Sequence, residues 1–266
     1  MSLLNKKSVC VITGASRGIG EGLAIQFAKC IAQDSVLILL ARSVPDLEVV
    51  QTKVLALPEC KKSNVKVIIK RFDQGSTNKE DFESLFSSIF KENNIFVSEF
   101  QQGIMIHNAG TLDETKFCKN LHYISKTGQF FQINLTGMIT LNAIFLQEFS
   151  KLSKVVVNMS SLAAVMPIKS WGLYCTVKSG RDMFFKILAI EDPSIRVLNY
   201  APGPVKTDMM NIVQTQSEDT EIQETYQKLN KEEKLLTAEM TCSKFMEILE
   251  LNKFESGVHI DYYDEY

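Results

Sequence analysis

The stretch Val9–Gly20, which reads VCVITGASRGIG, decides the fold because an apolar, β-branched run passes directly into a glycine-rich turn. The run predicts a buried strand, and the turn predicts the start of a helix. Gly14, Gly18 and Gly20 permit a tight turn and close backbone approach, so amide groups and the positive end of the helix can receive a pyrophosphate. A purely structural turn also uses glycines, but its place after the first strand favours a nucleotide site.

Six more apolar runs follow along the chain. They are residues 35–41, 65–72, 103–107, 154–160, 195–200 and 257–263. Continuous apolar runs suit strands that are covered on both faces, as in a parallel sheet. Helical patterns lie between them, and this alternation implies βαβ units with right-handed crossovers. The sequence therefore predicts an α/β fold, with a doubly wound, seven-stranded parallel sheet of Rossmann type in one domain over residues 1–266.

Two segments between the strands have distinctive patterns. In residues 78–94, Asn78 with Asp81 resembles an N-terminal cap, and the apolar side chains share one helix face. That face consists of Phe82, Leu85, Phe86, Ile89 and Phe90. Residues 214–234 are unusually polar and predict either a helical insertion or lid, or a solvated helix.

The composition argues against several classes of function. A net charge of -2 gives no general reason to bind nucleic acid or an anionic membrane. No run approaches the ~20 apolar residues that span a bilayer, and the N-terminal stretch lacks the pattern of a signal peptide. The six cysteines form no CxxC pair, which favours reduced packing thiols in the cytoplasm. The three histidines are too scattered to predict a metal site.

The ending of the second predicted strand, LILLARS, bears on the choice of nucleotide. Sites for NAD usually place an acid there for the ribose hydroxyls, but Arg42 stands in its place. Arg17, inside the glycine turn, adds a second guanidinium near the same ribose, and two such groups suit a 2′-phosphate. We therefore predict NADP(H), against the alternative that both arginines are merely surface charges.

A tyrosine and a lysine in YCTVK form a candidate catalytic pair. Tyr174 and Lys178 are four residues apart, so a helix projects both from one face. A free tyrosine has a pKa near ~10, too high for efficient acid–base work at neutral pH. Lowering the pKa by ~2 to 3 units requires ~3 to 4 kcal/mol, and one cation at ~4 Å supplies about that much at an effective dielectric constant of ~20. The spacing thus predicts a lowered tyrosine pKa.

These motifs together resemble the short-chain dehydrogenase/reductase family. The resemblance rests on TGASRGIG, HNAG, NLTG, Ser161, the Tyr174 and Lys178 pair, and PGPVKTDM, and covers essentially the whole chain. It implies that Tyr174 protonates a substrate carbonyl as the nicotinamide delivers hydride, while Ser161 hydrogen-bonds that carbonyl. It also implies that Lys178 holds the nicotinamide ribose and tunes Tyr174, and that Asn134 connects Lys178 to a water relay.

The resemblance further implies a set of residues that bind NADP(H). The residues after the third strand would meet the adenine, and the asparagine of HNAG would meet the adenosine side. The residues after the sixth strand would meet the nicotinamide end. The full set is Gly14, Ala15, Ser16, Arg17, Gly18, Ile19, Gly20, Arg42, Ser43, Asp73, Gln74, Asn108, Lys178, Val205, Lys206, Thr207, Asp208 and Met209.

Several residues leave alternatives open. His107 departs from the usual asparagine or apolar residue before NAG, and a satisfied histidine at a strand end is the favoured interpretation. Ser160 can donate as Ser161 can, but the spacing to Tyr174 matches the family for Ser161. Asn134 could instead cap the following helix. A serine hydrolase is disfavoured because no histidine sits where a serine triad would need one.

The substrate is predicted from the end of the chain. The segments around the catalytic helix and SGVHIDYYD resemble the pterin-reducing members of the family, which implies reduction of side-chain carbonyls of sepiapterin and 6-pyruvoyl-tetrahydropterin in tetrahydrobiopterin synthesis. Ligands of open α/β sheets bind beyond the carboxyl ends of the strands, and a carboxylate there can accept the two donors of a pterin edge. The predicted substrate contacts are Ser161, Leu162, Tyr174, Gly203 and Asp261. The alternatives are a reductase of steroids, quinones or small aldehydes, and a non-catalytic nucleotide-binding scaffold.

Three further expectations remain. Trp171 predicts either a flat apolar wall of the substrate pocket or a packing residue. The family resemblance implies a homodimer built through two helices of each subunit. In the last strand, Asp261 is expected to face the substrate, whereas Asp264 and Glu265 are expected to face solvent.

Overall fold

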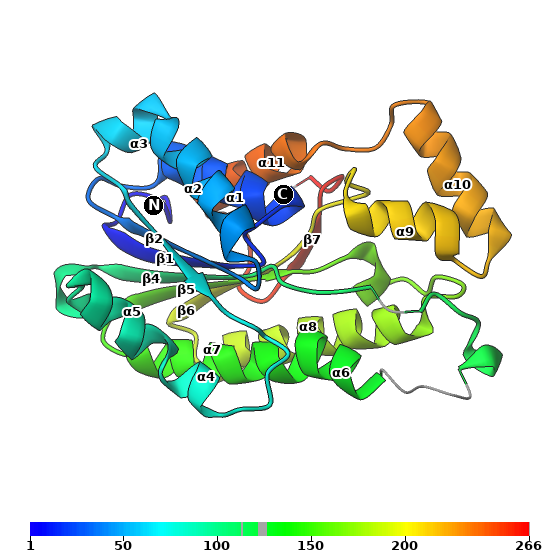
Figure 1. The fold of residues 1–266 in the computed structure, drawn as a ribbon, viewed down its shortest axis with the longest axis horizontal. Helices are drawn as coiled ribbons and strands as arrows, with labels where there is room; N and C mark the ends of the chain where they lie inside the picture. The colour runs from blue at the N-terminus through cyan, green and yellow to red at the C-terminus, as the bar shows by residue number, and fades with distance from the viewer. Residues whose placement is uncertain (113, 122–126, 266) are drawn as a thin grey trace.

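The computed structural model describes residues 1–112, 114–121 and 127–265. In this part of the chain, a seven-stranded sheet has the order β3-β2-β1-β4-β5-β6-β7, with every neighbouring pair parallel (Figure 1). The strands are β1 (Ser8–Thr13), β2 (Val36–Ala41), β3 (Lys66–Arg71), β4 (Gln102–His107), β5 (Ser153–Met159), β6 (Ile195–Ala201) and β7 (His259–Asp261). The predicted doubly wound parallel sheet is therefore confirmed.

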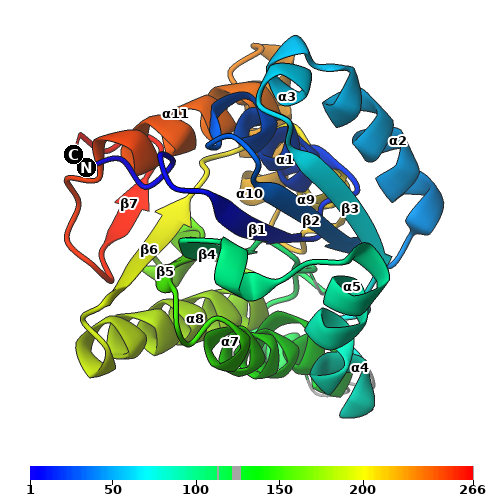
Figure 2. The same cartoon turned by 90° about the vertical axis from the view of Figure 1, so that its left-hand side faces the viewer.

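Helices cover both faces of this sheet. They are α1 (Gly18–Cys30), α2 (Val44–Ala56), α3 (Pro58–Lys62), α4 (Glu80–Glu83), α5 (Leu85–Asn93), α6 (Thr127–Phe131), α7 (Gly137–Glu148), α8 (Gly172–Glu191), α9 (Asp208–Gln216), α10 (Thr220–Lys231) and α11 (Ala238–Leu251). Helices α1, α2, α3 and α11 lie on one face, and α4, α5, α7 and α8 lie on the other (Figure 2). Every residue of β1 and β2 is buried because side chains of both faces meet a helix layer.

The strand order reverses between β1 and β4, which places the glycine turn beside the residues that follow β4. From β1 the chain winds outward to β3, then crosses back to β4 on the other side of β1. At such a switch point the loops beyond the carboxyl ends diverge and leave room for a ligand. Helices α9 and α10 extend to one side beyond this end of the sheet (Figure 1).

Two predicted elements differ from the observed ones in their bounds. The pattern at 78–94 forms α4 and α5 rather than one helix, although its five apolar side chains are all buried as expected. The last strand is shorter than 257–263 because Gly257 has φ +85° and the Asp264 N–H bonds back to the Asp261 carbonyl, which closes a turn. The chain therefore leaves the sheet directly after Asp261.

The polar segment 214–234 contains the end of α9 and all of α10. Ile222, Tyr226 and Leu229 form one stripe of α10 and pack against the apolar cluster around Tyr174. The Tyr226 ring stacks on Trp171, with centroids 6.0 Å apart. This stripe identifies α10 as a packed helical insertion rather than a fully solvated helix.

The cysteines differ in burial. All six are free thiols; Cys10, Cys60 and Cys242 are buried as the packing interpretation expects, Cys175 is half-buried, and Cys30 and Cys118 are exposed. Among the described residues no helix is both long and apolar enough to cross a bilayer.

Candidate active site

The glycine turn after β1 has a backbone that side chains would block. Gly14 has φ +65°, and a Cβ built on Gly20 would lie 2.1 Å from the Gly14 carbonyl oxygen. Asn108, which follows β4, donates its amide to the carbonyls of Thr13 and Gly14 at 2.9 and 3.1 Å. The side chain of Asn108 thus holds the turn from the neighbouring strand.

This turn fits a dinucleotide. Because the glycines lack side chains, a ligand can approach the backbone of the turn closely. The first turn of α1 also offers N–H groups that have no partner within the helix. Ala15 is buried and donates its N–H to the Leu40 carbonyl at 3.1 Å, whereas Ser16 and Ile19 are half-buried around the turn. The Ala15 N–H is therefore already used within the fold, and the N–H groups of Ser16 to Ile19 are the ones that would hold a pyrophosphate.

The two arginines predicted at the ribose have different surroundings. Arg42 is exposed after β2, and the following Ser43 caps α2 by accepting the Asp46 N–H. Arg17 is exposed as well, but its guanidinium pairs with Asp208 at 2.8 Å. A 2′-phosphate would therefore compete with the Asp208 carboxylate for Arg17.

The residues predicted at the adenine end lie after β3. Asp73 is half-buried and accepts the Gly75 N–H at 3.0 Å. Gln74 is buried, and its amide donates to the Ile133 carbonyl at 2.6 Å, so its side chain makes a hydrogen bond inside the protein. Of the two, Asp73 has the side chain nearer to solvent.

Helix α8 holds the predicted catalytic pair on one buried face. The Lys178 ammonium lies 5.5 Å from the centre of the Tyr174 ring. It donates to the carbonyl oxygens of Met159 at 2.7 Å and Ser160 at 3.4 Å, where β5 ends. The four-residue spacing therefore brings phenol and ammonium together as expected.

The pKa of Tyr174 contradicts the direction expected from the sequence. Burial raises the pKa of Tyr174 to about 12, although Arg181 and the Ser161 hydroxyl both act to lower it. Burial also lowers the pKa of Lys178 well below its usual value, with help from the Arg181 charge, while Asp182 opposes this. The prediction of a lowered Tyr174 pKa was therefore wrong for the protein without its cofactor. It counted the charge of Lys178 but left out the hydration that the buried phenolate loses.

The two adjacent serines have separate partners. Ser160 is buried, and its hydroxyl donates to the Asp182 carboxylate at 2.5 Å. Ser161 is half-buried beside Tyr174, and its hydroxyl accepts the Ala163 N–H at 3.2 Å. The geometry thus favours Ser161 over Ser160 for contact with a substrate carbonyl.

Asn134 lies within one turn of π-helix, Gln132–Thr136, between α6 and α7. Its side chain accepts the Thr111 N–H at 2.9 Å and donates to the Phe130 carbonyl at 3.0 Å, so it does not cap α7. Its backbone carbonyl faces the Arg181 guanidinium at 3.5 Å. A π-turn of this kind frequently marks a functional site.

The segment 205–209 lies between the glycine turn and Tyr174. A Cβ on Gly18 would lie 3.4 Å from the Thr207 methyl group, while the Tyr174 hydroxyl contacts the Met209 sulfur at 3.9 Å. Val205 is buried against Leu236, and Lys206 is exposed. This segment therefore borders the space between the glycine turn and Tyr174.

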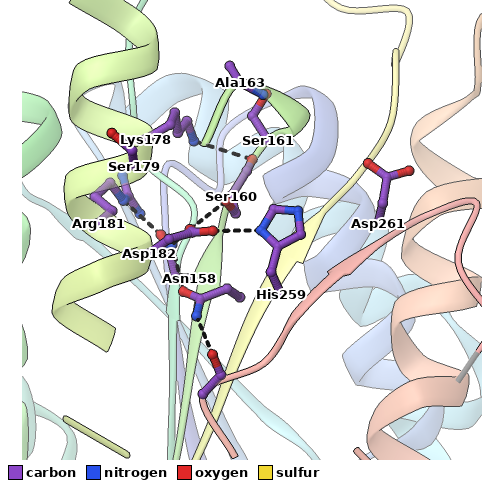
Figure 3. Close-up of polar contacts among 12 residues, drawn as sticks. Asn158, Ser160, Ser161, Ala163, Lys178, Ser179, Arg181, Asp182, His259 and Asp261 are labelled. Atoms are coloured by element: carbon purple, nitrogen blue, oxygen red, sulfur yellow. Dashed lines mark hydrogen bonds and ion pairs between the residues drawn. The ribbon is translucent and has the colours of Figure 1, made fainter. Parts of the chain in front are cut away.

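The predicted substrate contacts surround the carboxyl ends of β5, β6 and β7. Leu162 is exposed, and Gly203 has φ +71° and packs against Tyr262 and Tyr263. Asp261 is half-buried; burial raises the pKa of its carboxyl group, whereas the Tyr263 N–H bond lowers it. Figure 3 shows the Asp261 carboxylate pointing toward the same end of the sheet as Ser161.

Comparison with known proteins agrees with this arrangement. The family model described as short chain dehydrogenase matches residues 8–218. The chain belongs to this family. It is therefore an oxidoreductase that acts on carbonyl or alcohol groups with a nicotinamide cofactor.

Three comparisons show how far the similarity extends. Sepiapterin reductase of Rattus norvegicus is 38% identical over 97% of each chain. Benzil reductase ((S)-benzoin forming) of Bacillus cereus is 31% identical over 93% of this chain and 96% of its own. The crystal structure of the KRED1-Pglu enzyme has a TM-score of 0.79 at 23% identity, covering 95% of this chain and 100% of its own.

Sequence reasoning missed a buried polar network beneath the dehydrogenase site. Arg181 is fully buried; its guanidinium donates to the side chain of Asn158 at 2.7 Å and to the His107 carbonyl at 2.7 Å. Asp182 pairs with His259 at 2.6 Å. The helix period could have predicted this network. Arg181 and Asp182 come one turn after Lys178, and therefore lie on the same buried face of α8.

His107 occupies the buried strand-end position that was favoured for it, but it is only half satisfied, because its Nδ1 has no hydrogen-bond partner among the described residues. It is fully buried, its Nε2 lies 3.2 Å from the Asn142 side-chain oxygen, and its ring packs against Phe185. Burial and the Arg181 charge lower the pKa of His107 to about 3, so the imidazole is neutral at physiological pH.

Trp171 is buried between Tyr174 and Tyr226, which identifies it chiefly as a packing residue.

Proposed function

We propose that this dehydrogenase uses NADPH to reduce the side-chain carbonyls of pterins, with sepiapterin and 6-pyruvoyl-tetrahydropterin as substrates, as in tetrahydrobiopterin synthesis. The single observation that carries the proposal is the half-buried carboxylate of Asp261 at the carboxyl end of β7. Similarity to a sepiapterin reductase over 97% of the chain supports it.

The chemistry of a carboxylate at this edge suits the pterin ring. The 2-amino group and the adjacent ring N–H donate in parallel, and a carboxylate accepts two such bonds at once. Because Asp261 is partly withdrawn from water, it gains more from two N–H donors than a solvated acid would. The carboxylate would thus anchor the ring and direct the side-chain carbonyl toward Ser161 and Tyr174.

At that carbonyl, the chain supplies a hydrogen bond and a proton. Ser161 donates its hydroxyl to the carbonyl oxygen and so polarises it. Tyr174, with its pKa raised to about 12, is fully protonated at neutral pH, which is the form a proton donor must have. The nicotinamide supplies the hydride when it is bound. An alkoxide forming at the substrate oxygen is a far stronger base than a phenolate, so the Tyr174 proton moves to it.

The proposed preference for NADPH rests on Arg17 and Arg42. Both are exposed, on the turn after β1 and at the end of β2, and neither strand end carries an acid that would bind ribose hydroxyls. Direct titration of the protein with NADPH and NADH tests this part. Equal affinity for the two, or tighter binding of NADH, contradicts it.

The test of the substrate compares sepiapterin with a small diketone that lacks the pterin ring. We expect Asp261→Asn to raise the KM for sepiapterin by about tenfold relative to the KM for the diketone, since a charged acceptor is lost. Glu265→Gln is the matched control, because it removes an exposed acid from the same tail and leaves that ratio unchanged. An unchanged ratio in Asp261→Asn removes the anchor from the proposal.

A second candidate is a general reductase of diketones and related small carbonyls. The similarity to a benzil reductase at 31% identity favours it. In that case the diketone is reduced with a higher kcat/KM than sepiapterin, and Asp261→Asn affects the two substrates equally.

The expected homodimer and cytoplasmic location are also proposed. Helix α8 exposes Met183, Ile187 and Ile190, which are 58%, 45% and 78% exposed, on one outer stripe that a second subunit would cover. Size measurement by light scattering tests this, with Ile187→Asp expected to give monomers. The six free thiols are consistent with a reducing compartment.

A further inference from the structure

The carboxylate of Asp182 lies at the centre of the buried network between the catalytic helix and the substrate end of the sheet. It accepts hydrogen bonds from Asn158 at 2.9 Å, Ser160 at 2.5 Å and His259 at 2.6 Å (Figure 3). Asp182 is only 3% exposed. A carboxylate buried so deeply is costly unless its oxygens are satisfied, and here three donors satisfy them.

These donors belong to two different strands. Asn158 lies in β5 and Ser160 directly follows it, while His259 is the first residue of β7. Asp182 itself belongs to α8, one helical turn after Lys178. One side chain therefore ties the catalytic helix to both strands.

The β5 side of this network also holds the catalytic lysine. Lys178 donates to the carbonyls of Met159 and Ser160, and the Ser160 hydroxyl is bound to Asp182. The backbone that accepts the hydrogen bonds of Lys178 is thus held in place by Asp182, which lies one helical turn after Lys178.

The β7 side holds a short edge strand whose backbone bonds go to β6. β7 is three residues long, lies at the edge of the sheet and pairs with β6 alone. Since side chains alternate along a strand, His259 and Asp261 share one face. Asp261 pairs with Ala201 of β6, its side chain accepts the Tyr263 N–H, and its own N–H donates to the Asp264 carboxylate. The bond from His259 to Asp182 adds a side-chain tether to the face of β7 that carries Asp261, beside the backbone bonds to β6.

Arg181 does not compensate Asp182 directly. Its guanidinium bonds to the side-chain oxygen of Asn158, whose amide nitrogen in turn bonds to Asp182. Consequently, the oxygen that faces β7 remains available to His259, whose side chain is 12% exposed.

We propose that Asp182 is a positioning residue that acts through His259, holding β7 so that Asp261 meets the substrate ring while the carbonyl lies at Ser161 and Tyr174. The inference rests on the proposed role of Asp261 as the substrate anchor. Because an anchor displaced by about 1 Å can cost up to ~100-fold in rate, a fixed strand end matters as much as the carboxylate itself.

The test uses two substitutions of one residue in the full-length protein. His259→Leu removes the hydrogen-bond donor to Asp182. His259→Asn keeps an N–H donor, because the Asn side-chain nitrogen is as many bonds from the backbone as the Nδ1 of His259. We expect His259→Leu to raise the KM ratio of sepiapterin to small diketone by about tenfold and to speed amide hydrogen exchange in residues 257–263. His259→Asn should restore both measurements most of the way to wild type.

A double substitution tests whether His259 acts through Asp261. In the Asp261→Asn background, His259→Leu should change the sepiapterin KM by no more than about twofold, because coupled residues are not additive. A full additional tenfold effect would overturn the proposal, and so would unchanged exchange in His259→Leu alone.

Hydrogen exchange also separates this inference from the proposed function. If Asp261→Asn leaves the sepiapterin KM unchanged, the anchor fails as a function. Faster exchange in His259→Leu, restored by His259→Asn, then still supports positioning of β7 by Asp182, and unchanged exchange overturns it.

Discussion

The substitution Gly20→Ala tests the nucleotide cradle with a single methyl group. The added Cβ would lie 2.1 Å from the Gly14 carbonyl oxygen and 2.7 Å from the Asn108 amide nitrogen. The first distance is roughly 0.9 Å short of the closest approach that real Cβ atoms show, so the backbone of the turn or the start of α1 must move.

The cost can be estimated from the contacts that this movement breaks. Overpacking costs about 1–3 kcal/mol, and the two Asn108 bonds to the turn contribute about 1 kcal/mol each. The gain from alanine in a helix offsets about 1 kcal/mol. Unfolding free energy should therefore fall by roughly 2–4 kcal/mol, which lowers Tm by roughly 4–8 °C in a chain of this length.

The assay measures Tm by calorimetry and NADPH affinity by fluorescence. We expect the Kd for NADPH to rise by at least about tenfold, since the amides that face the pyrophosphate are displaced. Gly128→Ala is the control, because none of the described residues has an atom within 4 Å of a Cβ at that position in α6. If Gly20→Ala keeps its Tm within about 2 °C and its NADPH affinity within about twofold, the close contact with Gly14 is not what requires glycine.

Three further substitutions test other parts of the site. Tyr174→Phe should bind NADPH normally and lose at least about 100-fold in turnover, because the proton donor is gone; turnover within about tenfold of wild type would contradict its acid role. Asp208→Asn releases Arg17 from an exposed ion pair worth up to about 1 kcal/mol, so NADPH should bind up to about fivefold tighter at low salt only. Equal tightening for NADH would refute that explanation. Burial raises the pKa of Asp261, so its contribution to stability is fully present below the usual carboxyl pKa and is lost as the pH rises through the raised value. Asp261→Asn should therefore show a small rise in Tm at neutral pH that disappears in acid, and a lower Tm at neutral pH would count against it.

The seven strands and their parallel, doubly wound sheet could be predicted because local patterns carry that information, whereas the order of the strands is known only from the structure. The run 36–41 is apolar throughout, and a strand between two helix layers buries every residue of such a run, as β2 shows. The glycine turn was equally local, since the contact that requires Gly20 is with a residue six positions earlier in the same turn. The limits of β7 were not predicted, because Asp264 closes the turn through a bond that no periodicity encodes.

The candidate site was predictable in its members but not in its electrostatics. Spacing alone placed Tyr174 above Lys178 on one face of α8. The pKa of Tyr174 depends instead on how much water the surrounding elements exclude, and α8, α9 and α10 all contribute to that apolar cluster. The direction of the shift could not be obtained from one neighbouring charge.

The sequence by itself determined the doubly wound sheet, the glycine turn and the face of α8 that carries Tyr174 and Lys178, because strand and helix periods and a glycine turn act within a few residues. The tertiary structure alone decided which serine faces Tyr174, what Arg17 pairs with and how Asp182 joins α8 to β7. Those contacts bring together residues up to 191 positions apart, as Arg17 and Asp208 are. Only the closing of the sheet and its helix layers sets the distance between such groups, and with it the hydration that each charge loses.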